Sequence, residues 1–385
     1  MIVKGGEIID PALGIHDKRD IGISQGKIIA LEHDIAANEA KNIIDAKGKI
    51  VTPGLIDSHS HVADGIITIG VSPDECGVFS GVTTVCDAGS TGCANFMSFR
   101  KYVIPRAKTD IFCFLNLCST GLTVIPEIWS WNTIDPEATI KVIEENRDII
   151  KGIKLRATGA LVKNLGSETV KTAKGIASEV NLPLMIHLGI DPEENVPENV
   201  VNSFTREMLS LLDQGDILTH IYTWKKGGVI GRDGGLLPGL KEAIQRGVIL
   251  DVAYAKTHFS IEITRIGLEQ GVLPTTVSTD LTAMNINDSV YSLPVTMSKL
   301  LALGFNMDQL ITMTTINPAK MLKEEHHRGT LRAGMSADIS ILELAEGDFL
   351  FANGKIGQTF TGKSMIVPRL TLKSGVEIET KPRFD

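Results

Sequence analysis

Residues of the types that bind metal ions follow one apolar run after another along this 385-residue chain. They are His59 and His61 in GLIDSHSHV, Lys154 in IKGIKLRATG, His187 in LPLMIHLG, His220 in DILTHIY and Asp280 in TTVSTDLT. Core packing does not explain a polar residue at the end of each run. A parallel β/α barrel does, because the carboxyl ends of its strands converge on one face. Histidines and carboxylates that converge in this way indicate a metal-centred hydrolytic site.

The histidines differ in how strongly they indicate a metal. His59 and His61 are two residues apart, so on an extended strand both side chains point to the same face and can hold one ion. A chance pair on a surface loop is the alternative, but this pair follows an apolar run and a Pro-Gly turn. A lone histidine such as His187 or His220 is more often a hydrogen-bonded core residue. Two of them on successive predicted strands favour metal binding.

Asp280 and Lys154 each have a structural alternative. Asp280 precedes Leu-Thr and is suited to cap a helix, yet a carboxylate on the last strand can also bind a metal and accept a proton from water. The ammonium group of Lys154 would be repelled by a cluster of divalent cations. It could therefore point away from the cluster or pair with an acid such as Asp87 or Asp280.

The middle of the chain alternates between strand-like and helix-like patterns. Strands are predicted at residues 54–59, 82–87, 111–118, 151–155, 183–188, 216–220, 247–252 and 275–280. Helical patterns such as PEATIKVIEENRDII, SETVKTAKGIASEV and LPGLKEAIQRG lie between them. Eight such alternations predict an α/β fold, a (β/α)8 TIM-like barrel. A doubly wound sheet would be favoured by a glycine-rich fingerprint after the first strand, but His59 and His61 occupy that place.

Both ends of the chain are rich in short strand patterns with glycine turns. IVKGGEIID and NIIDAKGKIVTPG near the start resemble ADISILEL and MIVPRLTLKSGVEI near the end. Neither end alone can cover a sheet face, so we expect one small β-sandwich built from both. The predicted domains are residues 1–53 with 326–385 for the sandwich and 54–325 for the inserted barrel.

Composition excludes several kinds of partner. A net charge of −8 and a pI near 5.7, without a long basic run, argue against nucleic acid. No apolar run approaches membrane length, and the N-terminus has no signal-peptide h-region. Five cysteines without a CxxC pair favour buried thiols in a reducing cytoplasm over disulfides. We expect a soluble cytoplasmic protein with a small-molecule substrate and no membrane partner; its oligomeric state, a homo-oligomer included, stays open.

Several motifs together resemble the amidohydrolase superfamily, and within it the dihydroorotase-like and deacetylase-like metal-dependent hydrolases. PGLIDSHSH resembles the signature of the first strand, IKGIKLR the lysine strand, and STD the aspartate strand. NPAKMLKEEHHRGTLRAGMSADISIL resembles the return of the chain into the sandwich. The resemblance spans essentially the whole chain. Within the last motif, Glu324-Glu325-His326-His327 is interpreted as a solvated helix end rather than a metal site.

The resemblance implies a binuclear metal centre with two divalent ions, most simply zinc. His59, His61 and Asp280 would hold the more buried ion, and His187 and His220 the more exposed one. Lys154 would carry a carbamate derived from CO₂ and bridge the two. Two such ions activate a shared water and polarise the scissile carbonyl, while Asp280 acts as general base.

The chain departs from the family pattern where the substrate should bind. Dihydroorotases usually carry an arginine two residues after the His-x-His pair, but here Val62 and Ala63 follow His61. Nucleobase deaminases with a single metal lack the lysine. Relatives also often show Gly-His-Gly after the seventh strand, where this chain has a segment from Asp251 to His258. The residues expected near the substrate are Thr91, Asn116, Arg156, Tyr222 and Tyr254.

These observations predict a hydrolase of the deacetylase or aminoacylase type. Its substrate would be an amide or ester of a small carboxylate-bearing molecule, with Arg156 as a candidate to bind the carboxylate or, alternatively, to form a salt bridge on the barrel rim. The alternative enzymes are a cyclic amidohydrolase of the dihydroorotase kind and an adenine-type nucleobase deaminase. A non-catalytic barrel is disfavoured because all six metal-binding residues are kept.

Overall fold

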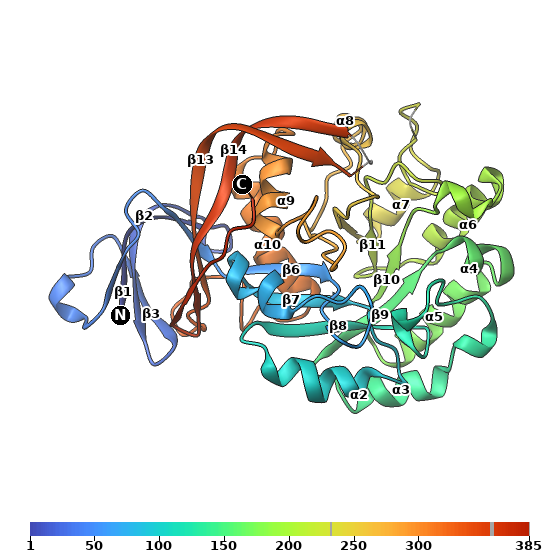
Figure 1. Ribbon diagram of the computed structural model, residues 1–385, viewed down its shortest axis with the longest axis horizontal. Helices are drawn as coiled ribbons and strands as arrows, with labels where there is room; N and C mark the ends of the chain where they lie inside the picture. Colours follow the sequence, from blue (N-terminus) through green and yellow to red (C-terminus); the bar gives the residue numbers. More distant parts are fainter. Residues whose placement is uncertain (232, 355–357, 385) are drawn as a thin grey trace.

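The protein consists of a parallel sheet from the middle of the chain and a second sheet from its two ends (Figure 1). The computed structural model describes residues 1–231, 233–354 and 358–384. Within these ranges, none of the helices has the length and apolar composition that a membrane crossing requires.

The parallel sheet contains seven regular strands among the described residues. They are β6 (Leu55–Ser60), β7 (Val82–Ala88), β8 (Asp110–Asn116), β9 (Ile150–Arg156), β10 (Leu184–His187), β11 (Ile217–Thr219) and β12 (Ile249–Asp251). Each pairs in parallel with the next along the chain, in the order β12-β11-β10-β9-β8-β7-β6. All seven fall on the first seven predicted strands, because each predicted range contains a short apolar run that turn residues delimit.

The eighth predicted strand, 275–280, is an extended segment rather than a regular strand. It is joined to both edges of the sheet by single bridges, Asp251 to Thr276 and Ser60 to Leu281. Asp280 has a φ of 52°, in the left-handed region, so the ladder cannot continue through it. The prediction of a regular strand here is wrong. The barrel nevertheless closes through this segment, since Asp280 N donates to His59 O at 2.7 Å and Tyr254 N donates to Ser278 O at 3.0 Å.

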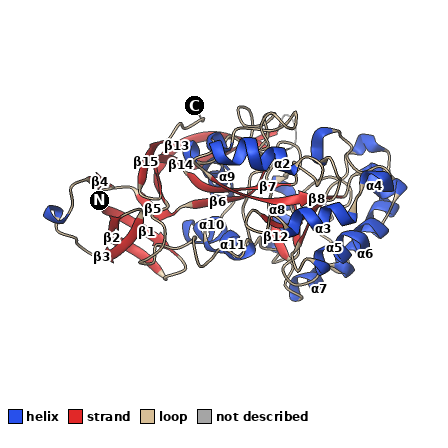
Figure 2. Ribbon diagram, turned by 90° about the horizontal axis from the view of Figure 1, so that it is seen from below, coloured by secondary structure: helices blue, strands red, loops and turns tan. Residues whose placement is uncertain are grey.

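Helices connect the strands of the barrel and lead from its closing segment to the second sheet. They are α1 (Pro73–Cys76), α2 (Phe96–Ser98), α3 (Pro136–Glu144), α4 (Gly159–Asn164), α5 (Glu168–Glu179), α6 (Glu198–Leu211), α7 (Leu240–Gln245), α8 (Ile261–Glu269), α9 (Leu293–Leu301), α10 (Met307–Thr314) and α11 (Ile316–Met321). Helices α3, α5 and α7 lie within the three predicted helical patterns. Asp135 caps α3 by accepting from Ala138 N at 3.0 Å, which explains its sharp start. Figure 2 shows α3 to α7 gathered at the end of the molecule away from β1.

Short 3-10 or π segments complete the helical part. They are η1 (Ala37–Glu39), η2 (Val78–Ser80), η3 (Phe99–Val103), η4 (Ile104–Arg106), η5 (Gly121–Thr123), η6 (Trp131–Thr133) and η7 (Pro192–Glu194). The Glu324–His327 segment follows α11 and lies away from the ligand cluster. Glu324 pairs with Lys151 at 2.7 Å, and the two histidines are exposed. The carboxylate of Glu324 therefore forms an ion pair with a residue of β9 and takes no part in the ligand cluster.

The second sheet combines strands from both ends of the chain, as predicted. They are β1 (Ile2–Asp10), β2 (Ile15–Ser24), β3 (Lys27–Glu32), β4 (Ile43–Asp45), β5 (Ile50–Pro53), β13 (Ile339–Asn353), β14 (Gln358–Lys373) and β15 (Val376–Glu379). Seven form one hydrogen-bonded path, β15-β14-β13-β5-β1-β2-β3, and β4 pairs with β1. This sheet encloses its own core, which includes Val3, Ile8, Ile21 and Ile339. The exact domain boundaries remain a prediction.

The long strands β13 and β14 leave this sheet and extend along the barrel (Figure 1). Ile366 N on β14 donates to Ser298 Oγ on α9 at 2.8 Å, and Phe351 and Met365 pack with Val295. At the far end, Ile261 N donates to Asn353 Oδ1 at 3.2 Å, and Tyr254 donates its hydroxyl proton to Ala352 O. The C-terminal strands therefore support the barrel wall that follows β12.

Candidate metal centre

The six residues predicted to bind metal converge at the carboxyl end of the parallel strands. His59 lies in β6, His61 directly after it, Lys154 in β9, and His187 at the end of β10. His220 follows β11, and Asp280 lies on the segment that closes the barrel. All six side chains are buried or nearly so. The barrel thus brings together residues up to 221 positions apart, from His59 to Asp280, in one cluster.

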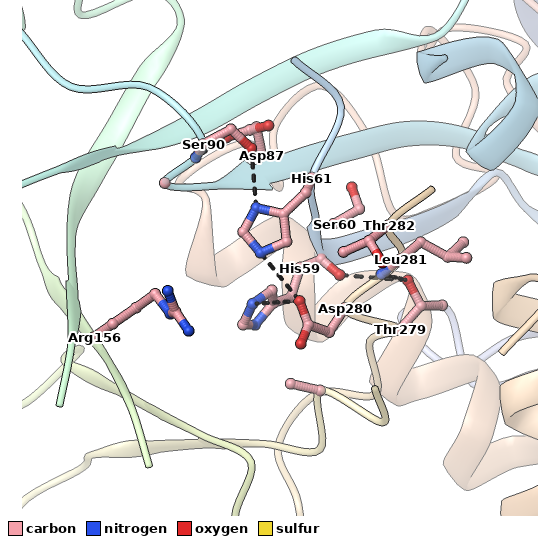
Figure 3. A network of polar contacts seen from close by, with 12 residues as sticks. His59, Ser60, His61, Asp87, Ser90, Arg156, Thr279, Asp280, Leu281 and Thr282 are labelled. Atoms are coloured by element: carbon pink, nitrogen blue, oxygen red, sulfur yellow. Dashed lines mark hydrogen bonds and ion pairs between the residues drawn. The ribbon is translucent and has the colours of Figure 1, made fainter. Parts of the chain in front are cut away.

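His59, His61 and Asp280 form the first group of ligand atoms. Asp280 Oδ1 lies 3.1 Å from His61 Nε2 and 3.5 Å from His59 Nε2 (Figure 3). Asp280 Oδ2 lies 3.7 Å from His220 Nε2, so the same carboxylate also faces the second group. Two imidazoles and a carboxylate are a ligand set that zinc accepts.

A second group consists of His187, His220 and a histidine that sequence reasoning did not select, His258. The ring centroids of His187 and His220 are 4.3 Å apart, and those of His220 and His258 are 4.2 Å apart. Within this group, as within the first, the possible ligand atoms all lie within 4.8 Å of one another. His258 stands on an irregular segment after β12, so no strand-end signal marked it.

Lys154 is completely buried between the two groups. Its Nζ lies 3.2 Å from His59 Nε2 and 3.4 Å from Met185 Sδ. Asp87, the alternative partner, instead accepts from Val62 N and Ser90 N at 2.8 and 2.7 Å. Burial lowers the pKa of Lys154 to about 8 despite the nearby carboxylates Asp280 and Asp251. The neutral amine is therefore far more populated near neutral pH than in an exposed lysine, although the ammonium form still predominates.

Gly89 leaves room for the side chain of Lys154. A Cβ on Gly89 would lie 2.6 Å from Cβ and Cγ of Lys154, closer than non-bonded carbon atoms approach. The φ of Gly89 is also +89°, a conformation that disfavours other residues. The glycine after β7 thus allows the lysine side chain to pass the neighbouring backbone.

Polar contacts behind the ligands orient three histidine rings, two of them through hydrogen bonds. His61 Nδ1 lies 2.9 Å from Ser90 Oγ, and His220 Nδ1 donates to Ala253 O at 2.8 Å. His59 Nδ1 lies 3.4 Å from a carboxylate oxygen of Asp251. In each case Nδ1 faces the surrounding protein, which leaves Nε2 for the centre of the cluster. The sequence did not indicate a role for Ser90 or Asp251, although Asp251 ends the seventh apolar run.

Burial favours the neutral form of three imidazoles of the cluster, and the contacts of Asp280 with the histidines favour its ionised form. Burial lowers the pKa of His59, His187 and His220 well below the usual range. Burial alone would raise the pKa of Asp280, but the charge interaction with His59 and the hydrogen bond from His61 hold it well below its usual value. Neutral imidazole and ionised carboxylate are the forms that bind metal.

The residues present fit a pair of divalent metal ions. His220 Nε2 is buried and has no hydrogen-bond partner among the described residues, although buried polar atoms normally have one. His220 and Asp280 also adopt φ values of 63° and 52°, which non-glycine residues rarely do. Such strain persists where the surrounding structure enforces it, and it is common at functional sites. A metal ligand role accounts for both observations.

A cavity of about 210 Å³ opens onto this cluster. It is lined by His59, His61, Ile69, Leu122, Ile125, Lys154, Arg156, His187, Ala255, Lys256, Thr257, His258, Asp280, Thr282, Met284 and Asn285. Arg156 reaches toward the cluster (Figure 3), and its Nη1 donates to the buried carboxylate of Glu127 at 3.0 Å. Both interpretations of Arg156 thus have support. Nη1 forms the salt bridge with Glu127, and the guanidinium has further N–H donors for a substrate.

The other predicted substrate contacts do not line this cavity. The Asn116 amide donates to Gly89 O and its carbonyl accepts from Cys118 N, both at 2.8 Å. The Tyr222 hydroxyl donates to Val272 O at 2.8 Å, and Tyr254 binds the C-terminal strands. Thr91 is buried, and its backbone carbonyl accepts from Asn116 N. These side chains stabilise the backbone around the site rather than line the cavity. Their position near a strand end could not distinguish these two roles.

Comparison with known proteins identifies the family. A profile of the amidohydrolase family matches residues 50–375. A deacetylase of Agrobacterium fabrum is 33% identical over 89% of this chain and 82% of its own length, and a deacetylase of Enterococcus faecalis is 30% identical over 92% and 94%. Solved structures described as a dihydroorotase and an adenine deaminase superimpose with TM-scores of 0.86 and 0.88. The first is 29% identical over 99% of both chains, and the second is 28% identical over 98% of this chain and 99% of that one. The chain therefore belongs to the amidohydrolase family.

Proposed function

We propose that the protein is a binuclear metal-dependent hydrolase that cleaves an amide or ester bond in a small carboxylate-bearing molecule. One observation carries the proposal: two groups of ligand atoms meet around Asp280 and the buried Lys154. Family membership supports a hydrolase that acts on C–N bonds, and the deacetylase relatives support removal of an acyl group.

The residues divide into those that hold the metals and one that moves a proton. His59, His61 and Asp280 would hold one divalent ion, with zinc as the proposed metal, and His187 and His220 would hold the other. When bound, such ions supply Lewis acidity that activates water and polarises a carbonyl. Asp280 takes the proton of the attacking water at its carboxylate and passes it to the leaving group.

Lys154 contributes as a carbamate in this proposal. Its neutral Nζ attacks CO₂, an N–C bond forms as one C=O π bond of CO₂ opens, and the nitrogen loses one proton, so the side chain changes from a neutral amine to an anion. The lowered pKa of Lys154, about 8, makes the neutral amine accessible, and an anion is stabilised between two cations where an ammonium is not. The contact of Nζ with His59 Nε2, at 3.2 Å, supports this role.

Arg156 is the proposed binding group for the substrate carboxylate. Its guanidinium reaches the cavity, and only Nη1 is engaged in the contact with Glu127 described above. The cavity of about 210 Å³ suits a small molecule, and its apolar lining by Ile69, Leu122 and Ile125 accommodates the uncharged part. The five free cysteines agree with a cytoplasmic location, which we include in the proposal.

A cyclic amidohydrolase or an adenine-type deaminase is the second candidate. The dihydroorotase relatives and the two structural neighbours favour it. The absence of an arginine two residues after His61 argues against a dihydroorotase, because Ala63 stands there.

A product-resolved screen separates the candidates. Metal-loaded enzyme is incubated separately with N-acyl amino acids, acylated hydroxy acids, cyclic ureides and aminopurines. The Asp280→Asn variant is the control for each compound. Release of a free acid from the acylated compounds is expected. Ammonia from an aminopurine, or ring opening of a ureide without any deacylation, would replace the proposal by the second candidate.

A further inference from the structure

His258 lies within the second ligand group although neither a strand end nor the family pattern marks it. Its ring centroid is 4.6 Å from that of His187 and 4.2 Å from that of His220. The side chain is buried but lines the cavity. Three imidazoles packed in this way have their nitrogen atoms within reach of one ion.

The two ring nitrogens of His258 face different surroundings. Nδ1 lies 3.5 Å from Thr223 Oγ1, and Nε2 lies 3.0 Å from Lys225 Nζ. His59, His61 and His220 show the same division, with Nδ1 toward the protein and Nε2 toward the cluster. His258 Nδ1 thus also faces a side chain of the surrounding protein, which leaves Nε2, the nitrogen that Lys225 contacts, as the candidate ligand atom.

Lys225 resembles Lys154 in its contact with a histidine. Lys154 Nζ lies 3.2 Å from His59 Nε2, so each ligand group has a buried lysine against one Nε2 atom. Lys225 also has two other partners, Asp191 Oδ1 at 2.7 Å and Thr257 Oγ1 at 3.3 Å. It can therefore release His258 Nε2 and keep its ion pair.

Backbone geometry provides the space that this histidine needs. A Cβ on Gly189, two residues after His187, would lie 2.8 Å from Thr223 Oγ1 and 3.1 Å from His258 Nδ1. Gly189 has a φ of +96°, which favours glycine. The chain after β10 is thus shaped to admit the His258 ring beside His187.

We propose that His258 is an additional ligand of the second metal ion, which completes a three-histidine site with His187 and His220, and that Lys225 competes with the ion for His258 Nε2. The inference rests on the proposed two-metal centre and deepens it. It also explains why the segment after β12 ends in a buried histidine whose ring lines the cavity.

The test measures zinc binding directly, without activity. Chelator-stripped enzyme is titrated with Zn²⁺ against a competing chromophoric chelator, in the parent and in His258→Gln. We expect the parent to bind two ions. His258→Gln should weaken the second site by at least about tenfold and leave the first unchanged, because even partners outside the ligand shell contribute that much to metal affinity. His327→Ala, an exposed histidine outside the cluster, is the matched control.

The Lys225→Met variant provides a second test if His258→Gln does not fold. Lys225→Met removes the competing ammonium, so the second ion should bind more tightly than in the parent. An unchanged second dissociation constant in folded His258→Gln, or unchanged or weaker binding in Lys225→Met, would overturn the role of His258 while two ions still bind to the parent. A parent that binds only one ion would instead overturn the two-metal proposal itself.

Discussion

Asp57 on the first barrel strand holds Thr279 on the segment that closes the barrel. Asp57 Oδ1 accepts from Thr279 N at 3.1 Å, and Oδ2 accepts from Thr279 Oγ1 at 2.5 Å. The two residues are 222 positions apart and both are buried. Their neighbours in sequence are the metal-binding candidates His59 and Asp280. This pair therefore fixes Asp280 beside His59 although no regular strand is present there.

Thr279→Val should loosen this connection. The variant keeps the shape of the side chain but leaves one oxygen of a buried carboxyl group without its donor, which costs about 1–3 kcal/mol of unfolding free energy. Zinc affinity of the first group should fall as well. Chemical denaturation and zinc titration measure the two effects. Thr312→Val, whose hydroxyl bonds only to a backbone carbonyl on α10, is the control; equal behaviour of both variants would show that the pair contributes nothing specific.

Asp280→Asn should retain metal but lose turnover. The amide oxygen can still approach an ion, yet it cannot accept the proton of water, so kcat should fall by about 10²–10⁴-fold. Elemental analysis and steady-state kinetics on the same preparation check both parts. Asp288→Asn, a nearby exposed carboxylate that pairs with Lys256, should remain active. Activity of Asp280→Asn within a few-fold of the parent would show that another group is the base.

Lys154→Ala should lose metal and activity while the barrel stays folded. Intact mass of the parent should show one added CO₂, and short carboxylic acids should partly restore metal binding to the variant by occupying the vacated bridge. Lys151→Ala is the matched control, because Lys151 lies on the same strand and pairs with Glu324 outside the site. A fully metallated, active parent with unmodified Lys154 would contradict the bridge.

Arg156→Lys should impair binding of carboxylate substrates. Lysine keeps the charge but loses the planar fork that binds a carboxylate with two hydrogen bonds, so KM should rise by about 10- to 100-fold with a smaller change in kcat. Neutral analogues without the carboxylate should be hydrolysed equally by parent and variant. Equal losses for both kinds of substrate would indicate that Arg156 acts only through its ion pair with Glu127.

Lys299 should make stability depend on pH. It is fully buried on α9, its Nζ lies 4.1 Å over the Tyr254 ring, and burial lowers its pKa to about 7. Between about pH 7 and 10.5 the unfolded chain binds more protons at this residue than the folded one, so the free energy of unfolding rises with pH, by at most ~1.4 kcal/mol per unit. Below that window both states are protonated and the contribution is constant.

Lys299→Met tests this assignment. Urea unfolding across the window should show a rise for the parent relative to the variant, since methionine cannot titrate. Parallel pH dependences in parent and variant would mean that Lys299 keeps its charge in the folded protein.

The sequence by itself determined the first seven strands and predicted which candidate ligands meet at one end of the barrel. Apolar runs with polar ends are a local signal, and parallel strands necessarily bring their carboxyl ends together. His59, His61, Lys154, His187 and His220 were therefore predictable from position along the chain.

Tertiary structure alone decided what depends on contacts between distant segments. His258 approaches His187 and His220 because the irregular loop after β12 is held by β13, which no local pattern encodes. Asn116 ends β8 and Tyr222 lies just beyond β11, yet their side chains bond to backbone carbonyls instead of facing the cavity. The left-handed φ of Asp280 likewise follows from barrel closure. Strand-end position identifies which residues reach the site face, whereas packing decides which of them face the cavity.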